Sequence, residues 1–187
     1  SVSAGVRMKG DGEVLFFTAE YISDKFIGEK LSAQIAEFLH DFIFSPLTEN
    51  GGFNKEYTAG EKGNLKNAIL GPVNDKKAYT EFKCREAMFG KEGYGMFEAG
   101  YAEDLDGITP VNLYEFYKDV LNKSKIDIFI SGTVDDETVG DVERILGSAF
   151  EDRDANYIGT TVAESEGTEL KTVSEEADVV QSKLCMG

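Results

Sequence analysis

Residues 2–21 read VSAGVRMKGDGEVLFFTAEY, and this stretch decides the fold class. Two runs suited to extended backbone, Val2 to Met8 and Glu13 to Tyr21, are joined by Lys9-Gly10-Asp11-Gly12. An Asp-Gly pair between two such runs is a strong hairpin signal, because both turn positions favour positive φ. The apolar run Val14-Leu15-Phe16-Phe17 is typical of a strand that is buried on both faces. The sequence therefore predicts that the chain opens with an antiparallel pair of strands.

Helical periodicity dominates the next part of the chain. Large apolar side chains recur at helical spacing from a cap at Ser23 or Asp24 to just before Pro46, which ends the helix. Further helices are predicted at 53–70, at 75–89, from Thr109-Pro110 onward, and at 137–149. The helix that begins at Pro110 is expected to carry one apolar face, formed by Leu113, Phe116, Tyr117 and Val120.

Loops and a late strand complete the predicted order of elements. Asn50-Gly51-Gly52 is expected to be a loop, and residues 126–131 form an apolar run that predicts a strand. Residues 151–174 are acidic and poor in large apolar side chains, so they are expected to be a linker. Strands that open and close a helical block favour an α+β fold, with a mostly antiparallel sheet and the helices packed on one face.

Charge and composition exclude several classes of function. The 187 residues include 35 Asp and Glu against 19 Lys and Arg, which gives a formal net charge of −16. The electrostatic field of such a negative charge repels phosphate backbones, and no basic cluster interleaved with aromatic residues offsets it. No nucleic-acid partner is therefore expected. The acidity fits either a well-solvated surface of bacterial type or attraction to a basic partner. No apolar run approaches the roughly 20 residues of a membrane-spanning helix, so no membrane partner is expected.

Candidate catalytic residues are scarce in this chain. Zinc catalysis needs three protein ligands, yet the chain has one histidine, His40. It lies next to the apolar face of a predicted helix, where a packed or surface imidazole is the usual finding. No H-E-x-x-H, H-x-x-E-H or G-x-S-x-G motif occurs, and the many acidic residues single out no carboxylate pair. Gly90-x-x-Gly93-x-Gly95 lacks the Gly-Lys-Ser/Thr of a phosphate loop and is expected to be a flexible connection with a helix C-cap.

The two cysteines show no sequence motif for a disulfide framework or a metal site. Cys84 and Cys185 lie far apart in the sequence, and neither belongs to a C-x-x-C pair. This usage favours a reducing compartment, so a cytoplasmic protein is expected. No catalytic, cofactor or metal site is predicted within the chain.

Several segments, in their order and spacing, resemble motifs of the insulinase/pitrilysin family of zinc peptidases (inverzincins), close to bacterial members described as insulinase-like or inactive. The resemblance covers most of residues 1–150 and the last dozen residues. The pair Glu61-Lys62 is similar to the Glu-Arg/Lys pair of the helix behind the family's active site. The matching segments are Phe53–Lys62, Pro72–Tyr79, Gly93–Gly100, Leu105–Tyr117, Ile126–Gly132 and Gln181–Gly187.

The resemblance implies a half-unit of the insulinase or mitochondrial-processing-peptidase type. Residues 1–150 would form most of one half-unit whose start is missing, and 175–187 would form the first strand of a following half-unit, so a fragment of a longer polypeptide is expected. In active relatives the H-x-x-E-H motif would precede Ser1. A third zinc ligand, a glutamate seven residues after the position of Glu61, would fall on Ala68, and alanine cannot bind zinc. The resemblance therefore implies a half-unit without metal or cofactor.

Three functions are compatible with these observations. The first is a non-catalytic domain that contributes chamber wall and contacts to a peptide substrate or to a second peptidase-like half or subunit. In the family, a hairpin strand near the chamber can pair with an extended peptide, and the corresponding residues here are Ser3, Ala4, Gly5, Val6 and Arg7, although ordinary pairing within the sheet fits them equally. The second is a fragment of an active zinc metallopeptidase whose H-x-x-E-H motif lies upstream. The third is a binding module unrelated to proteolysis.

Overall fold

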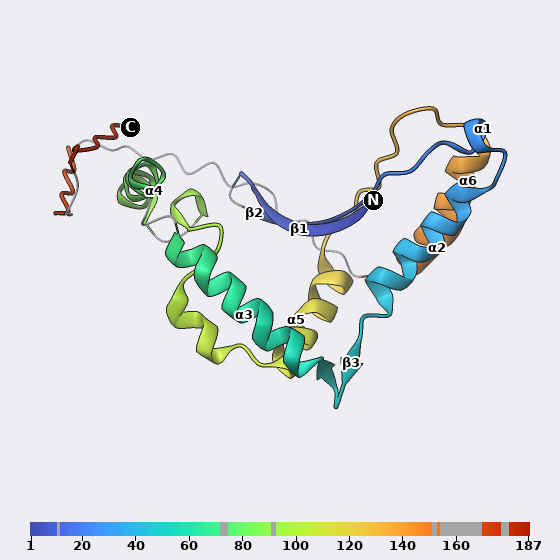
Figure 1. Cartoon of the computed structure of the whole chain (residues 1–187), viewed down its shortest axis with the longest axis horizontal. Coiled ribbons are helices and arrows are strands. Elements are labelled where there is room, and N and C mark those ends of the chain that lie inside the picture. The colour runs from blue at the N-terminus through green and yellow to red at the C-terminus, as the bar shows by residue number, and fades with distance from the viewer. Residues whose placement is uncertain (11, 72–74, 91–92, 151–152, 154–169, 177–179) are drawn as a thin grey trace. The chain divides into compact units, whose positions relative to one another are not determined.

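The structure, a computed structural model, has an α+β architecture (Figure 1). It describes residues 1–10, 12–71, 75–90, 93–150, 153, 170–176 and 180–187. Short 3-10 turns lie at Gly93–Gly95, Ala102–Gly107 and Gly147–Phe150. The strands and α-helices are β1 (Val2–Lys9), β2 (Gly12–Ala19), α1 (Asp24–Ile27), α2 (Leu31–Phe44), β3 (Thr48–Glu49), β4 (Gly52–Phe53), α3 (Lys55–Leu70), α4 (Lys76–Phe89), α5 (Pro110–Lys123) and α6 (Asp136–Leu146).

The chain divides into two compact units. The first contains residues 1–6, 15–55 and 110–158, and the second contains 7–14, 56–109 and 159–187. The open end of the β1–β2 hairpin therefore belongs to the first unit and its turn end to the second. Each unit is assembled from segments that are distant in sequence.

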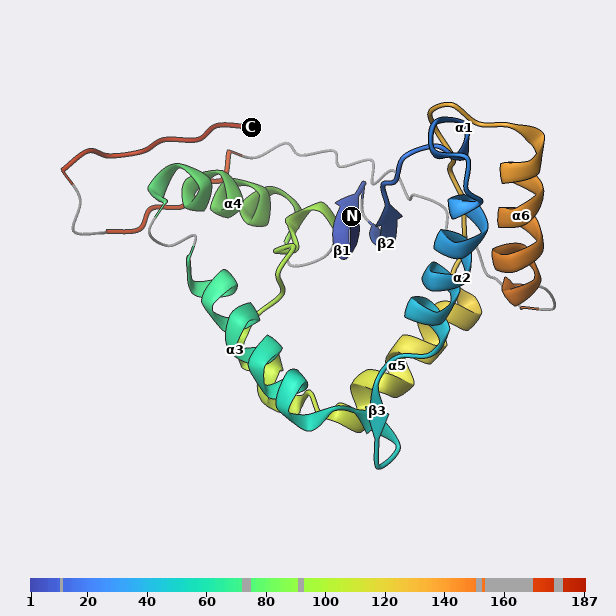
Figure 2. The ribbon, with the colours of Figure 1, turned by 45° about the vertical axis from the view of Figure 1, so that its right-hand side comes forward.

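In the first unit, α2 and α6 lie side by side and run in the same direction (Figures 1 and 2). Lys30 before α2 forms an ion pair with Glu137 in the first turn of α6. At the other end, the Phe44 and Phe150 ring centroids are 5.1 Å apart. Two small side chains one turn apart on α2, Ser32 and Ala36, are both buried.

The short β3–β4 hairpin packs on α5 in the same unit. Asn50 and Gly51 both adopt positive φ, as a two-residue turn of type I′ requires. The Phe53 ring makes edge contacts with the rings of Tyr114 and Tyr117, at centroid distances of 5.2 and 5.6 Å. The Tyr117 hydroxyl donates a hydrogen bond of 2.7 Å to the carbonyl of Ile43 at the end of α2. These contacts connect α5 to α2, and burial raises the pKa of Tyr117.

The second unit is organised around α4. Phe82 packs on Phe97, with centroids 4.9 Å apart, and the Gly93–Gly95 turn lies against the end of the helix. Lys83 forms ion pairs with Glu86, at 2.8 Å, and with Glu175, at 3.7 Å, which fixes the segment 170–176 beside α4. The Glu175 carboxylate also accepts a hydrogen bond from the Tyr79 hydroxyl, and this bond is the main reason that the pKa of Tyr79 is raised.

The predicted single helix from Ser23 or Asp24 to Pro46 is wrong, because the structure has two helices there. Gly28 adopts a left-handed conformation, with φ of 71°, and ends α1. The Asp24 carboxylate then accepts hydrogen bonds from the backbone N–H groups of Leu31 and Ser32, at 3.0 and 3.1 Å, and from the Ser32 hydroxyl, at 2.6 Å. It thereby satisfies donors that the first turn of α2 leaves without helical partners.

Replacing Asp24 with alanine is expected to lower the free energy of unfolding by about 1–2 kcal/mol, since two backbone donors and a hydroxyl lose their acceptor. Urea unfolding followed by circular dichroism measures this change. Asp41→Ala serves as a control, because Asp41 is an exposed carboxylate within α2 itself. Equal stability of the two variants would show that the Asp24 contacts do not hold α2.

The remaining helix predictions are largely confirmed. Asp75 caps α4 by accepting hydrogen bonds from the N–H groups of Lys77 and Ala78, and Gly90 with φ of 76° ends that helix. α5 begins at Pro110, although Phe116 is exposed and does not belong to the buried face. α3 begins at Lys55, because Phe53 is part of β4, and α6 ends at Leu146 in a 3-10 turn.

The prediction of one larger antiparallel sheet, with the helices packed on one of its faces, is wrong. The described strands form two separate two-stranded antiparallel sheets, β1–β2 and β3–β4. Residues 126–131 carry no strand, since they lie beside no described partner strand, and the Phe129 side chain is 89% exposed. Of the predicted terminal strand 175–187, the described residues 175–176 and 180–187 carry no strand either. Most of the predicted linker 151–174 and the turn residue Asp11 lie outside the described residues.

Candidate functional site

The β1–β2 hairpin carries the predicted peptide-contact residues, and its register follows from its terminal hydrogen bonds. The Ser1 amino group donates to the Glu20 carbonyl at 2.7 Å, and the Glu20 N–H donates back to the Ser1 carbonyl at 2.8 Å. Such an exchange defines a hydrogen-bonded pair, and these pairs recur at every second residue. Ser3 therefore faces Thr18, which agrees with the 2.7 Å hydrogen bond between their hydroxyl groups.

The two faces of the hairpin differ in composition. On the face of Ser3, the Phe16 ring covers Gly5 so closely that a Cβ atom on Gly5 would lie 2.7 Å from the ring. The opposite face carries mainly apolar side chains, including Val2, Val6 and Phe17, as the alternation of strand side chains requires. Phe17 packs edge-on against Phe42 of α2, with ring centroids 5.9 Å apart. This contact anchors β2 to the first unit and leaves β1 as the outer strand of the pair.

The register also identifies which backbone groups of β1 face outward. Ser3, Gly5 and Arg7 turn their N–H and C=O groups toward β2, whereas Ala4 and Val6 turn theirs away from it. The backbone groups of Met8 also face away from β2, and its N–H donates a 3.1 Å hydrogen bond to the Glu98 carboxylate. That bond shows that an acceptor outside the hairpin can pair with this edge. The structure thus separates the five predicted contact residues into two with outward backbone groups and three that pair inward.

The helix α3 carries the residues that the family resemblance singled out. The Lys62 ammonium donates a 2.8 Å hydrogen bond to the carbonyl of Ile108, so this side chain connects α3 to the segment before α5. Glu61 accepts a 3.4 Å hydrogen bond from the Asn64 amide. Ala68 lies two turns after Glu61, on the same side of the helix, and is exposed. The methyl group of Ala68 offers no metal-binding atom at this position.

The other residues considered from the sequence do not converge on a reactive centre. The His40 Nδ1 lies 3.3 Å from the Asp41 carboxylate, and its ring packs beside Phe44 with centroids 5.0 Å apart, so it is a partly exposed surface imidazole. Gly93–Gly95 forms a 3-10 turn packed against α4. Within the described ranges, no group of three or more His, Cys, Asp and Glu side chains could hold a metal ion.

One proximity was not anticipated from the sequence. The free cysteines Cys84 and Cys185 line the same pocket beside α4. Only a folded chain brings them together, since their segments are far apart in sequence. The one local signal was the placement of Met88 four residues after Cys84 on α4, which puts both side chains on one helix face.

Comparison with known proteins gives one curated relative and one similar structure. No protein-family model matches the chain. It is 31% identical over 191 residues to a protein of Bacillus subtilis (strain 168) named "Probable inactive metalloprotease YmfF", and the alignment covers 100% of this chain and 44% of that protein. The chain therefore spans less than half the length of the relative. The similarity relates the chain to a metallopeptidase-like protein.

The similar structure is described as the crystal structure of a conserved protein from Enterococcus faecalis V583. It superimposes with a TM-score of 0.72 at 26% sequence identity, and covers 78% of this chain and 35% of that chain. Across the part of the chain that is described, no helix is both long and apolar enough to cross a membrane.

Proposed function

We propose that this chain is a non-catalytic domain of an insulinase-type metallopeptidase-like protein that binds an extended peptide, or a partner segment, along the outer edge of β1. The observation that carries the proposal is the outward orientation of the Ala4 and Val6 backbone groups. They lie on a strand whose one partner strand among the described residues is β2, on its other side. An extended peptide can satisfy such groups by adding a strand. The proposal places this edge on the wall of a chamber closed by a second peptidase-like half or subunit.

The proposal that this domain is non-catalytic rests on the sequence of α3. An active half-unit of this type needs an acidic zinc ligand at the position of Ala68, and no Asp or Glu occurs between Glu61 and Asp75. The name of the Bacillus relative also describes a protein without activity. The proposed role is therefore enclosure and contact, and a cytoplasmic location fits the two free thiols.

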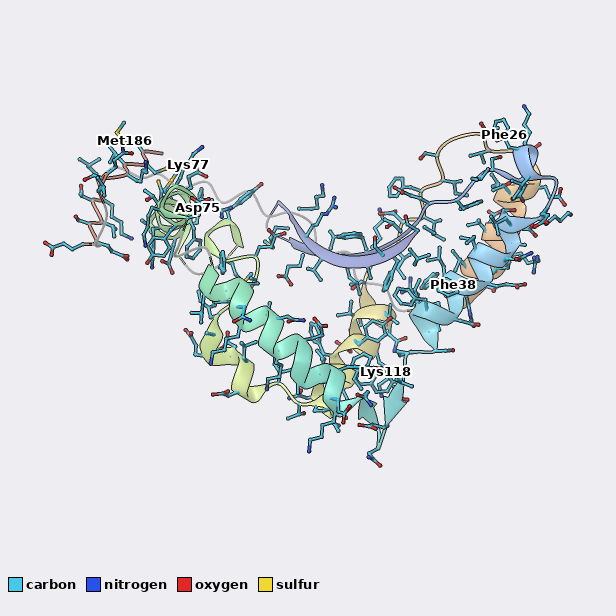
Figure 3. The ribbon with its side chains drawn as sticks, in the orientation of Figure 1. Phe26, Phe38, Asp75, Lys77, Lys118 and Met186 are labelled. Atoms are coloured by element: carbon cyan, nitrogen blue, oxygen red, sulfur yellow. The ribbon has the colours of Figure 1, made fainter. Side chains whose placement is uncertain are left out.

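Exposed apolar residues support a partner for the first unit. Phe26 and Phe38 on α1 and α2 are both mainly exposed, as Figure 3 shows for their labelled side chains. Three consecutive apolar residues outside the helices and strands, Ile128, Phe129 and Ile130, are exposed as well. Large apolar surface of this kind marks a protein–protein contact more often than an isolated exposed residue does.

A proline scan of the hairpin edges tests the proposal. Replacing Ala4 with proline removes an outward N–H group without removing any β1–β2 hydrogen bond, because Ala4 does not pair inward. Binding of a fluorescein-labelled peptide of alternating valine and lysine, which is extended and complements the net charge of −16, is expected to weaken about tenfold. Fluorescence anisotropy measures the dissociation constant.

The matched control is Ala19→Pro, which makes the same change at the outer edge of β2. This variant should bind the peptide as the unmodified chain does, and circular dichroism should show that both variants keep the helical content. Equal weakening by both substitutions, or by neither, would contradict binding along β1. Zinc analysis of the longer polypeptide, purified without chelator, separately tests the non-catalytic part: about one zinc per chain would contradict it.

A further inference from the structure

Four sulfur-containing side chains meet at one pocket in the second unit, outside the proposed peptide edge. The chain contains two cysteines and four methionines. Both cysteines and two of the methionines line a pocket of about 520 Å³ between α4 and the C-terminal segment. The four residues are Cys84 and Met88 from α4, and Cys185 and Met186 from the C-terminal segment.

The two segments are in direct contact at this pocket. Figures 1 and 2 show the C-terminal segment running beside α4, and Figure 3 labels Met186 on it. A Cβ atom on Gly187 would lie 2.6 Å from the Met88 sulfur and 3.7 Å from the Cys84 sulfur. The backbone of the segment therefore lies against both side chains.

We propose that Cys84 and Cys185, with Met88 and Met186 as supporting ligands, form a binding site for a soft monovalent cation, Cu(I). Thiolate and thioether sulfurs select this ion among the metals common in proteins. Zn(II) is a poor fit, because its sites use four ligands from cysteine, histidine and carboxylate side chains, and the pocket supplies two cysteines and one carboxylate, Glu81.

The charges around the pocket are compatible with such a complex. Binding of Cu(I) releases one proton from each thiol to solvent, so that two thiolates and one monovalent cation leave a net charge of −1 at the site. Arg85 lines the same pocket and offsets this charge, while Glu81 opposes it. Met186 is 84% exposed, so it lies at the rim of the pocket.

Competition with a chromogenic Cu(I) chelator tests the site. The reduced chain is titrated with Cu(I) under anaerobic conditions, so that no oxidation of thiol or metal enters the balance. We expect one Cu(I) per chain with ultraviolet absorption from thiolate-to-copper charge transfer. Cys84→Ser and Cys185→Ser should each weaken binding roughly hundredfold, and Met88→Leu about tenfold, in line with losses on removing groups from metal sites.

Two controls keep the test decisive. Met96→Leu changes a methionine outside the pocket and should bind as the unmodified chain does. Cys185→Ser alters a segment outside every helix, so it leaves a folded protein even if Cys84→Ser perturbs α4, and circular dichroism checks this. Binding of less than one Cu(I), the same affinity in both serine variants as in the unmodified chain, or equal affinity for Zn(II) would overturn the site. None of these outcomes depends on peptide binding at β1.

Discussion

Replacing Gly52 with alanine is expected to destabilise the first unit by roughly 3 kcal/mol or more. Gly52 is buried in β4, where a Cβ atom would lie 2.6 Å from the carbonyl carbon and 2.7 Å from the oxygen of Pro110, and 2.7 Å from the nitrogen of Val111. These are backbone atoms at the start of α5, so no flexible side chain can move aside. The methyl group must push β4 away from α5, which separates Phe53 from Tyr114 and Tyr117.

The control for this variant is Gly60→Ala. Gly60 lies within α3, and a Cβ atom there has no neighbour within 4 Å. Alanine at such a position should raise the free energy of unfolding by about 0.5–1 kcal/mol, because it restricts the unfolded chain and suits a helix. Chemical unfolding followed by circular dichroism measures both variants. A Gly52→Ala variant as stable as the unmodified chain would show that β4 and α5 are not packed as described.

The sequence predicted well those elements whose signals are local. The N-cap Asp75 and the opening Pro110 each specify a helix boundary through their own backbone geometry. The break at Gly28 escaped prediction, because apolar residues recur at helical spacing on both sides of it. The β3–β4 hairpin was taken for a loop, since strands of two residues show no alternation that a sequence can reveal.

The strand predicted at 126–131 shows the limit of pattern-based reasoning. A run of apolar, β-branched residues favours extended backbone, but a strand exists only where a neighbouring strand supplies hydrogen bonds. The described residues offer Ile128 and Phe129 no such neighbour, so the segment forms no strand and both side chains are exposed. Exposed apolar chain of this kind is the surface that a partner would be expected to cover.

The predicted peptide-contact residues stay a prediction, which the register of the hairpin makes more specific. The resemblance pointed to residues 3–7, but only the register separates Ala4 and Val6, which face outward, from Ser3, Gly5 and Arg7, which pair with β2. The proximity of Cys84 and Cys185 depends on the packing of the C-terminal segment against α4, and no spacing within the sequence encodes it. The residue types in a sequence identify candidate binding residues. The tertiary structure determines which of their backbone groups and side chains can contact a ligand.

The second large effect is expected for Leu146→Ala, which should lower the free energy of unfolding by about 2–5 kcal/mol. Leu146 is 6% exposed at the end of α6, and among the described residues it is one of few buried apolar side chains, with Ala36, Ile43 and Leu105. Removing three carbon atoms leaves a cavity that α2 and α6 cannot close freely. The Lys30–Glu137 ion pair at one end and the Phe44–Phe150 contact at the other fix their relative position.

Leu170→Ala is the matched control, because the same atoms are removed from a side chain that is 96% exposed, and its effect should stay within about 0.5 kcal/mol. Thermal unfolding and urea midpoints are measured for both variants. Because both lose the same atoms, a difference in their stability reports the burial of the Leu146 side chain. A small effect of Leu146→Ala would mean that α6 is held mainly by its ends. A large loss of stability in Leu146→Ala would mean that the α2–α6 contact depends on the buried Leu146 side chain. With so few buried apolar side chains among the described residues, each of them would then contribute substantially to stability.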